Sequence, residues 1–413
     1  MSSPSTDRPL TRSLAALYLR VPLGMRLGLE PMRAACARFG HPERAFEAVH
    51  VAGTNGKGSV CAMTDAIARA DGRRVGLYTS PHLCRFAERI QIDGAPVPDD
   101  MLAAILDKVL ADEAQLSFFE AATLAAFLAF REARVDVAVL EVGLGGRLDA
   151  TNVIPSPRAA AVTRIALDHT ETLGPTLEAI AREKAAIAKP GVELLLGPMS
   201  EGVRAAIDEV ARRSGATTRA IEDDAEATSF AGNARVGLAG AHQRSNAAIA
   251  YALGARIGAS VRAREEGIAN VRWPARLEQI ETPGGPVLLD GAHNPDGVAA
   301  LARHLAATAP GPAKTAVVFG TLQDKAWPEM IDLLAPLASV RVYATPSGRA
   351  ATDPRTIALR HAGSVAPTVS DAYDTARRAI GKDGLVVVCG SIHLVGETRA
   401  RLLGLPRDPP VAL

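Results

Sequence analysis

Short runs of aliphatic and β-branched residues alternate with longer Ala- and Leu-rich segments along this chain, and that alternation limits the folds available to it. Strands that follow one another through helical crossovers pair in parallel, so the pattern predicts a mainly parallel sheet covered by helices. We therefore expect an α/β protein. In the N-terminal part, strands are predicted over residues 46–53, 74–80, 136–143, 159–166 and 192–197, and helices over residues 59–70, 118–133 and 176–189.

The character of the sequence changes near residue 272. The stretch WPARLEQIETPGGP, which starts at Trp273, places prolines and a glycine pair around the strand-like RLEQIE. Such residues interrupt regular elements, and 413 residues exceed what one ordinary core requires. We predict two domains, residues 1–272 with a mainly parallel sheet and residues 273–413 as a smaller, Rossmann-like α/β domain. Strands of the second are predicted in PVLLDGAHN, KTAVVFGTL, SVRVYATP and GLVVVCGSIH.

The composition excludes several classes of function. With 46 basic and 45 acidic residues the formal net charge is +1, so the chain has no electrostatic footprint for nucleic acid or an anionic membrane. No stretch offers the roughly 18 apolar residues of a membrane span. The four cysteines have no CxxC spacing, which argues against a zinc knuckle or a disulfide framework. We expect a soluble, cytoplasmic protein.

The stretch VHVAGTNGKGSVC, residues 49–61, joins an apolar run to a predicted helix. A phosphate-binding loop needs glycines whose backbone N–H groups turn inward, a lysine that reaches the phosphates, and a hydroxyl that helps to hold Mg²⁺. Gly53, Gly56, Gly58 and Lys57 supply the first two, and a serine follows. The strand, loop and helix also occur in the required order.

The spacing of this loop departs from the common GxxxxGK[ST] pattern. Val51 stands where the first glycine would be, and Gly58 separates Lys57 from Ser59. The alternative interpretation is an ordinary glycine-rich turn with a solvated lysine. Because such a turn needs far fewer glycines, we favour a phosphate cradle and predict a P-loop-containing N-terminal domain.

Polar residues follow three of the predicted strands, at the edge where open α/β sheets bind ligands. Ser80 ends one strand, Glu141 ends the apolar VAVLE, and His169 follows AAAVTRIALD. A glutamate in this position suits Mg²⁺ beside transferring phosphates. Each has an alternative explanation: a helix cap for Ser80, a structural ion pair for Glu141, and a hydrogen-bonded core histidine for His169. For the histidine alone the residues favour the alternative, since Mg²⁺ prefers oxygen ligands.

Motifs spread between about residue 26 and residue 393 together resemble the folylpolyglutamate synthase family, which is related to the Mur ligases and includes bifunctional dihydrofolate synthase/folylpolyglutamate synthases. Their combination and order make the resemblance specific. The motifs are VAGTNGKGS, YTSPHLxRFxERI, SFFEAATLAAF, LEVGLGGRLDATN, IALDHTxxLG, IAREKAAI, DGAHNP and VCGSIH.

The resemblance implies that ATP and Mg²⁺ bind in the first domain and that the second domain completes the nucleotide site. It assigns Ser80, Glu141 and His169 to the metal. It also implies that Lys184 is carbamylated, a change that turns a cation into an anionic oxygen ligand but requires the neutral amine. Lys57, Lys184 and His169 are the implied catalytic residues. The implied nucleotide contacts are Thr54, Asn55, Gly56, Lys57, Gly58, Ser59, Asn246, Arg276, Asp290 and His293.

Three further stretches correspond to the family's pocket for the pterin acid. Arg26 stands where an acidic residue is expected and Ser117 replaces a threonine, so the preference of this pocket stays open. Phe118 and Phe119 are otherwise explained as core residues at a helix start, Arg276 with Asp290 as an interdomain salt bridge, and Asp290 also as a helix cap. The pocket residues implied are Arg26, Leu27, Gly28, Leu29, Ser117, Phe118, Phe119, Glu120, Leu148, Asp149 and Ala150.

By resemblance, the predicted activity is an ATP-dependent ligation. The γ-phosphate converts a carboxylate into an acyl phosphate, which the amine of L-glutamate then attacks. The implied acids are 7,8-dihydropteroate and reduced folates, and we expect a monomer. The alternatives are a folylpolyglutamate synthase without the first activity, a Mur-type ligase for another acid, and a P-loop switch that ligates nothing.

Overall fold

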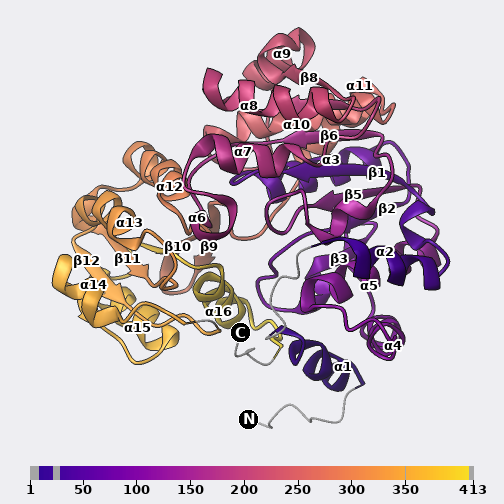
Figure 1. Ribbon diagram of the computed structural model, residues 1–413. Helices are drawn as coiled ribbons and strands as arrows, with labels where there is room; N and C mark the ends of the chain where they lie inside the picture. Colours follow the sequence, from indigo (N-terminus) through magenta and orange to yellow (C-terminus); the bar gives the residue numbers. More distant parts are fainter. Residues whose placement is uncertain (1–8, 22–27, 349, 409–413) are drawn as a thin grey trace.

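The computed structural model describes residues 9–21, 28–348 and 350–408, and its elements form two sheets, each wrapped by helices (Figure 1). In Figure 1 the second sheet and its helices, orange to yellow, lie to the left of the first. Within the described ranges, no helix is both long enough and apolar enough to cross a membrane. The mainly parallel α/β fold predicted from the alternation is confirmed.

The first sheet has eight strands in the order β4-β3-β2-β5-β1-β6-β7-β8. Its antiparallel pairs are β2 with β3 and β3 with β4, at one edge. The strand β1 lies between β5 and β6, so the loop that follows β1 opens near the middle of the carboxyl edge. The strands are β1 Glu47–Ala52, β2 Val75–Tyr78, β3 Ile90–Ile92, β4 Ala95–Pro96, β5 Val137–Glu141, β6 Ala159–Val162, β7 Glu193–Leu196 and β8 Thr217–Ala220.

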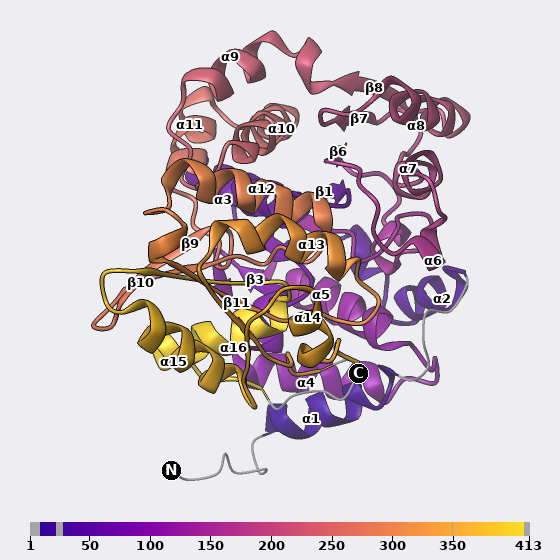
Figure 2. The ribbon, with the colours of Figure 1, turned by 90° about the vertical axis from the view of Figure 1, so that its left-hand side faces the viewer.

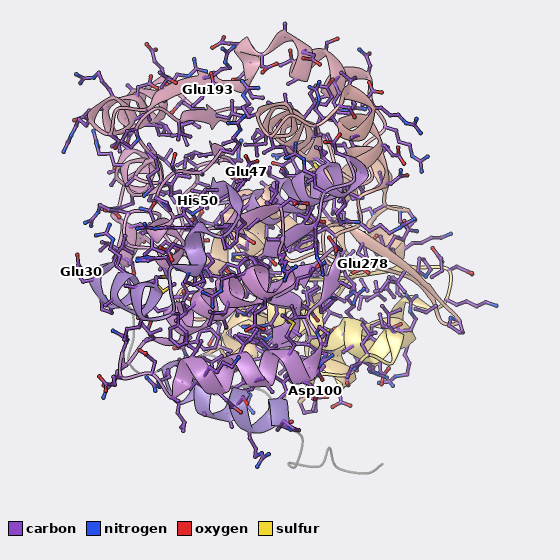
Figure 3. The ribbon with its side chains drawn as sticks, turned by 90° about the vertical axis from the view of Figure 1, so that its right-hand side faces the viewer. Glu30, Glu47, His50, Asp100, Glu193 and Glu278 are labelled. Atoms are coloured by element: carbon purple, nitrogen blue, oxygen red, sulfur yellow. The ribbon has the colours of Figure 1, made fainter. Side chains whose placement is uncertain are left out.

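Helices bury both faces of this sheet because its strands are apolar on both sides. Along β1, Val49 and Val51 pack on one face with α3, while Ala48 and Ala52 pack on the other. Figure 3 labels His50 on this strand, inside the first domain. The helices are α1 Pro9–Tyr18, α2 Glu30–Arg38, α3 Lys57–Ala70, α4 Asp99–Leu110, α5 Phe118–Ala133, α6 Thr170–Leu173, α7 Leu177–Ala185, α8 Glu201–Arg213, α9 Ala225–Asn233, α10 His242–Arg256 and α11 Val261–Asn270.

The second sheet has six strands in the order β13-β12-β11-β14-β10-β9, and only β9 runs antiparallel to its neighbour. Figure 2 views this domain face-on, with α12 and α13 above α15 and α16. The elements are β9 Glu278–Thr282, β10 Gly285–Leu289, α12 Pro295–Thr308, β11 Thr315–Phe319, α13 Trp327–Leu334, β12 Val340–Tyr343, α14 Pro354–Arg360, β13 Ser364–Val365, α15 Val369–Ile380, β14 Leu385–Cys389 and α16 Ile392–Leu403.

Differences from the predicted elements lie at ends and edges. The helix predicted from residue 59 begins at Lys57, and the strand predicted to residue 166 ends at Val162. The strands β3, β4, β8 and β13 were not predicted, and all lie at or next to a sheet edge, where fewer apolar residues are needed. The connection between α11 and β9 contains residues 272 and 273, and the boundary there stays a prediction.

Candidate active site

A cavity of about 400 Å³ lies where the carboxyl edge of the first sheet faces the second domain. Both domains contribute to its wall. It gathers the residues predicted for nucleotide and metal: Thr54, Asn55, Gly56, Lys57, Gly58, Ser59, Ser80, Glu141, His169, Lys184, Asn246, Arg276, Asp290 and His293.

The loop between β1 and α3 requires its glycines. Gly53 and Gly56 have φ of 147° and 92°, where side chains are strained. A Cβ on Gly56 would also lie 2.5 Å from Asn246 Oδ1. Lys57 curls over the loop, and its Nζ donates to the carbonyls of Gly53 and Thr54 at 3.0 and 3.1 Å. These bonds leave the ammonium charge without a described carboxylate partner, so an anion can take it up.

The first turn of α3 leads into a short chain of buried polar groups. Gln243 Nε2 donates to Ser59 Oγ at 3.2 Å, and Asn246 Nδ2 donates to Gln243 Oε1 at 2.9 Å. Gln243 is a cavity residue that sequence reasoning missed, although it stands three positions before Asn246 on α10. The chain fixes the amide of Asn246 beside Gly56.

Ser80 and Glu141 come together as expected for neighbouring strand ends. The backbone N–H of Ser80 donates to Glu141 Oε2 at 3.1 Å, and the Ser80–Pro81 peptide is cis. Burial raises the pKa of Glu141, while Lys57 and Arg276 oppose that rise. Glu141 makes no ion pair within the described residues, so the predicted alternative of a structural ion pair is not what the geometry shows. Its charge is available to a bound cation.

Lys184, near the end of α7, is only 5% exposed. Burial, and next the charge of Lys57, lower the pKa of Lys184 to about 7. A large share of the side chain is therefore the neutral amine at neutral pH, which is the form that reacts with CO₂. The absence of a side chain at Gly146 lets the backbone of α7 approach, since a Cβ there would lie 2.7 Å from Glu183 O.

His169 lies at the cavity in a left-handed conformation with φ of 50°. Its neighbour Asp168 is a hub that sequence reasoning missed. Asp168 accepts from Lys325 Nζ at 2.7 Å and from Asn294 Nδ2 at 3.0 Å, both in the second domain. Lys325 Nζ also lies 3.4 Å from His169 Nε2. Burial would raise the pKa of Asp168, but the charge of Lys325 holds it well below its usual range.

The second domain presents Arg276 from a constrained backbone. Ala275 and Leu277 on either side have φ of 58° and 49°. Asp290 holds this turn, because its two oxygens accept from the N–H groups of Leu277 and Ala292, each at 2.9 Å. No ion pair joins Arg276 to Asp290 in the described part of the chain, and α12 is capped by Asn294 rather than by Asp290.

The P-loop itself contacts the second domain. Asn55 Nδ2 donates to Asp296 Oδ2 at 2.8 Å and to Asn294 Oδ1 at 3.1 Å. Arg164 also pairs with Asp296, at 2.6 Å. His293 lies next to this contact, with Nδ1 2.8 Å from Gly291 O. The predicted nucleotide residue Asn55 is therefore committed to holding the domains together in this structure.

Two of the three segments predicted for the pterin acid meet at Gly143, which lines the main cavity. A Cβ on Gly143 would lie 2.4 Å from the Phe119 ring, and its N–H donates to Asp149 Oδ2 at 2.9 Å. Asp149 also binds Leu144 and Thr151, and Glu120 forms a capping box with Ser117. The carboxylates of Asp149 and Glu120 therefore hold the backbone of these two segments. Leu148 and Ala150 adjoin Asp149 in the chain. Gly28 and Leu29 belong to the described residues, whereas Arg26 and Leu27 lie outside them.

A divalent cation such as Mg²⁺ binds mainly to oxygen ligands. No cluster of three or more His, Cys, Asp or Glu side chains that could hold a metal occurs in the described ranges. The predicted set has one hydroxyl, one carboxylate and one imidazole around the phosphate loop. A hard cation would find only two oxygen side chains there, which fits an ion that also takes phosphate oxygens and keeps water.

Two Mur ligase family models match this chain. The Mur ligase middle domain matches residues 51–254, and the Mur ligase glutamate ligase domain matches residues 275–392. The Bacillus subtilis dihydrofolate synthase/folylpolyglutamate synthase is 32% identical over 94% of this chain and 97% of its own length. A probable bifunctional folylpolyglutamate synthase/dihydropteroate synthase of Haloferax volcanii is 35% identical over 90% of this chain, which spans only 48% of that protein.

Solved structures agree over almost the whole chain. Mycobacterium tuberculosis folylpolyglutamate synthase complexed with ADP has a TM-score of 0.86 and 30% identity, and covers 97% of this chain and 99% of its own. The Escherichia coli FolC complex with DHPP and ADP has a TM-score of 0.84 and 29% identity at the same coverage. A bifunctional folylpolyglutamate synthase/dihydrofolate synthase with Mn, AMPPNP and L-glutamate bound has a TM-score of 0.84 and 30% identity. The match covers 97% of this chain and 100% of that one. The chain belongs to the folylpolyglutamate synthase family of Mur ligases.

Proposed function

We propose that this chain is an ATP-dependent ligase that joins L-glutamate to 7,8-dihydropteroate and adds further glutamates to reduced folates. The observation that carries the proposal is that a phosphate loop, two buried ionisable side chains and an arginine from the second domain line the same cavity. The names and ligands of the related proteins supply the substrates. We also propose a cytoplasmic monomer divided at residues 272 and 273.

The chemistry follows from the charges around the cavity. A carboxylate is a poor acyl donor, and its conversion to an acyl phosphate removes that difficulty. Lys57 stabilises negative charge on the transferring phosphoryl group, and Arg276 approaches it from the second domain. Mg²⁺, held by Ser80, Glu141 and His169, would neutralise the phosphate oxygens. The amine of glutamate then attacks the acyl carbon, phosphate leaves, and an amide remains.

Lys184 and the interdomain contacts complete the proposal. The lowered pKa of Lys184 supports its carbamylation, which would add anionic oxygens beside the metal. The contacts of Asn55 and Asp168 with the second domain support a ligase that assembles its site when the domains meet. An open P-loop switch would not need them.

The test is ADP release by the full chain with ATP and Mg²⁺. We expect ADP only when an acid and L-glutamate are both present, with 7,8-dihydropteroate as well as with tetrahydrofolate. ADP release with tetrahydrofolate and L-glutamate but not with 7,8-dihydropteroate and L-glutamate would mean that the chain only extends polyglutamates. ADP release at the same rate with and without these acids would contradict the proposal.

A further inference from the structure

The first domain contains a buried positive charge that forms no ion pair with a carboxylate of the described residues. Arg89, the last residue of the short 3₁₀ helix Phe86–Arg89, is 7% exposed. Within the described residues, no Asp or Glu forms an ion pair with it, and the hydrogen bond of its guanidinium runs from Nε to His82 Nδ1 at 2.8 Å.

The guanidinium lies against aromatic rings. Its central carbon is 5.3 Å from the ring centre of Phe118 and 5.6 Å from that of Phe86. Tyr18 stacks on Phe118 with the ring centres 5.8 Å apart, and its buried Oη has no hydrogen-bond partner among the described residues. Two polar groups without full partners thus lie on one ring, and that ring belongs to the predicted acid pocket.

A second buried arginine shows what a structural role looks like in the same chain. Arg264 is also 7% exposed and lies 4.2 Å from the ring centre of Tyr251. Unlike Arg89, it forms an ion pair, with Nη1 3.2 Å from Glu226 Oε1, although its Nε and Nη1 have no hydrogen-bond partner among the described residues. The two arginines have the same exposure and each lies near an aromatic ring, and only Arg264 of the two has a carboxylate in an ion pair.

We propose that Arg89 is a specificity-determining residue that binds the carboxylate of the acid substrate beside the Phe118 ring. A buried, unpaired charge opposes folding, and a bound anion would compensate it. The planar guanidinium matches a carboxylate with two parallel N–H groups, while His82 keeps its orientation. The Tyr18 hydroxyl can donate to the same anion. The acid then lies between Phe118 and Glu141, whose charge acts on Arg89.

This inference rests on the proposed function, and equilibrium binding to the full chain separates the two. The ligands are 7,8-dihydropteroate, its methyl ester, and AMPPNP with Mg²⁺, measured by calorimetry. The unchanged chain should bind the acid about 10- to 100-fold more tightly than the ester, as expected for a hydrogen bond to a charged group. Failure to bind AMPPNP or either pterin would contradict the proposed function itself.

The decisive variant is Arg89→Met, which keeps the bulk and removes the charge. We expect it to lose the preference for the acid over the ester, to bind AMPPNP unchanged, and to melt at or above the temperature of the unchanged chain. Arg89→Lys should recover part of the preference. The matched control, Arg264→Met, should melt lower and keep the preference. The proposal is wrong if Arg89→Met retains the preference, or if it melts lower and weakens acid and ester equally.

Discussion

The two walls of the cavity hold their charged side chains in different ways. On the first-domain wall, Glu141 and Lys184 are buried with few partners, and burial raises the pKa of one and lowers that of the other. On the second-domain wall, Asp290 and Asp296 are committed to backbone N–H groups and to side chains of the chain itself. The first wall keeps its charges for ligands, whereas the second uses them to hold the domains and the turn that presents Arg276.

This difference predicts opposite balances of activity and stability. Substitutions on the first wall should reduce turnover strongly and stability little. Those on the second wall should do the reverse. Strained or unsatisfied groups are concentrated where a protein binds its ligands, because a group already satisfied within the fold has little to offer them.

The largest loss of turnover is expected for Lys57→Ala. Among the described residues the ammonium donates to two loop carbonyls, so its removal should change the free energy of unfolding by less than about 1.5 kcal/mol. Turnover should fall by about 100-fold or more, as when one donor to a developing charge is removed. Urea denaturation and steady-state kinetics measure the two effects.

Lys189→Ala is the matched control for this variant. Lys189 Nζ also donates to a backbone carbonyl, that of Asn152 at 3.0 Å, but the residue does not line the cavity. Its loss should leave turnover near normal. A stable Lys57→Ala enzyme with normal turnover would remove the phosphate loop from the reaction.

Glu141→Gln keeps the shape and removes the charge, and turnover should fall by about 100-fold. Because the pKa of Glu141 is raised in the folded state, its ionisation opposes folding as the pH rises above the ordinary value. The variant should therefore be no less stable at pH 7, and added Mg²⁺ should recover its turnover only in part. An unchanged Mg²⁺ dependence would place Glu141 outside the metal site.

Glu43→Gln is the control for burial. Glu43 is 5% exposed, as Glu141 is, but it pairs with His41 and Arg44 away from the cavity. Its loss should lower stability and spare turnover.

Carbamylation of Lys184 predicts a smaller, reversible effect. The folded pKa of about 7 lies below the ordinary lysine value of about 10.4, so stability from the neutral amine is present at high pH and is lost as the pH falls toward 7. Removal of CO₂ should lower turnover, bicarbonate should restore it, and the dependence should steepen below pH 7. Lys184→Arg should not respond to bicarbonate. A bicarbonate-independent enzyme, together with an active Lys184→Arg, would contradict carbamylation.

The sequence predicted the parallel sheets and gathered the nucleotide residues, because strand ends and glycine spacing are local signals. It could not reveal that Lys184 is buried, since that depends on how α7 packs against Gly146. Asp168 and Lys325 lie 157 positions apart in the chain, and nothing in either local stretch predicts their contact. Arg89 is part of the motif ERI, but the sequence does not show that it is buried without an ion pair to a described carboxylate, because that depends on the fold.

The smallest loss of turnover is expected on the second wall, where stability should change instead. The pair between Lys325 and Asp168 is buried, with side chains 6% and 8% exposed. Removal of one partner strands the other charge, so Lys325→Gln should lower the free energy of unfolding by about 3–5 kcal/mol. The pair between Arg164 and Asp296 also joins the domains, but the arginine is 56% exposed. Arg164→Gln should cost about 1 kcal/mol or less, because solvent screens such pairs.

Measurement of both variants by urea denaturation separates burial from position, since both pairs cross between the domains beside the cavity. At saturating substrate both should retain most of their turnover, because neither side chain is proposed to contact the transferring phosphoryl group. Equal destabilisation by the two substitutions would mean that the interdomain contact, rather than its burial, sets the cost. If the Lys325→Gln enzyme is stable but as inactive as Lys57→Ala, Lys325 serves ligand binding rather than stability. The two walls would then not differ in the way described.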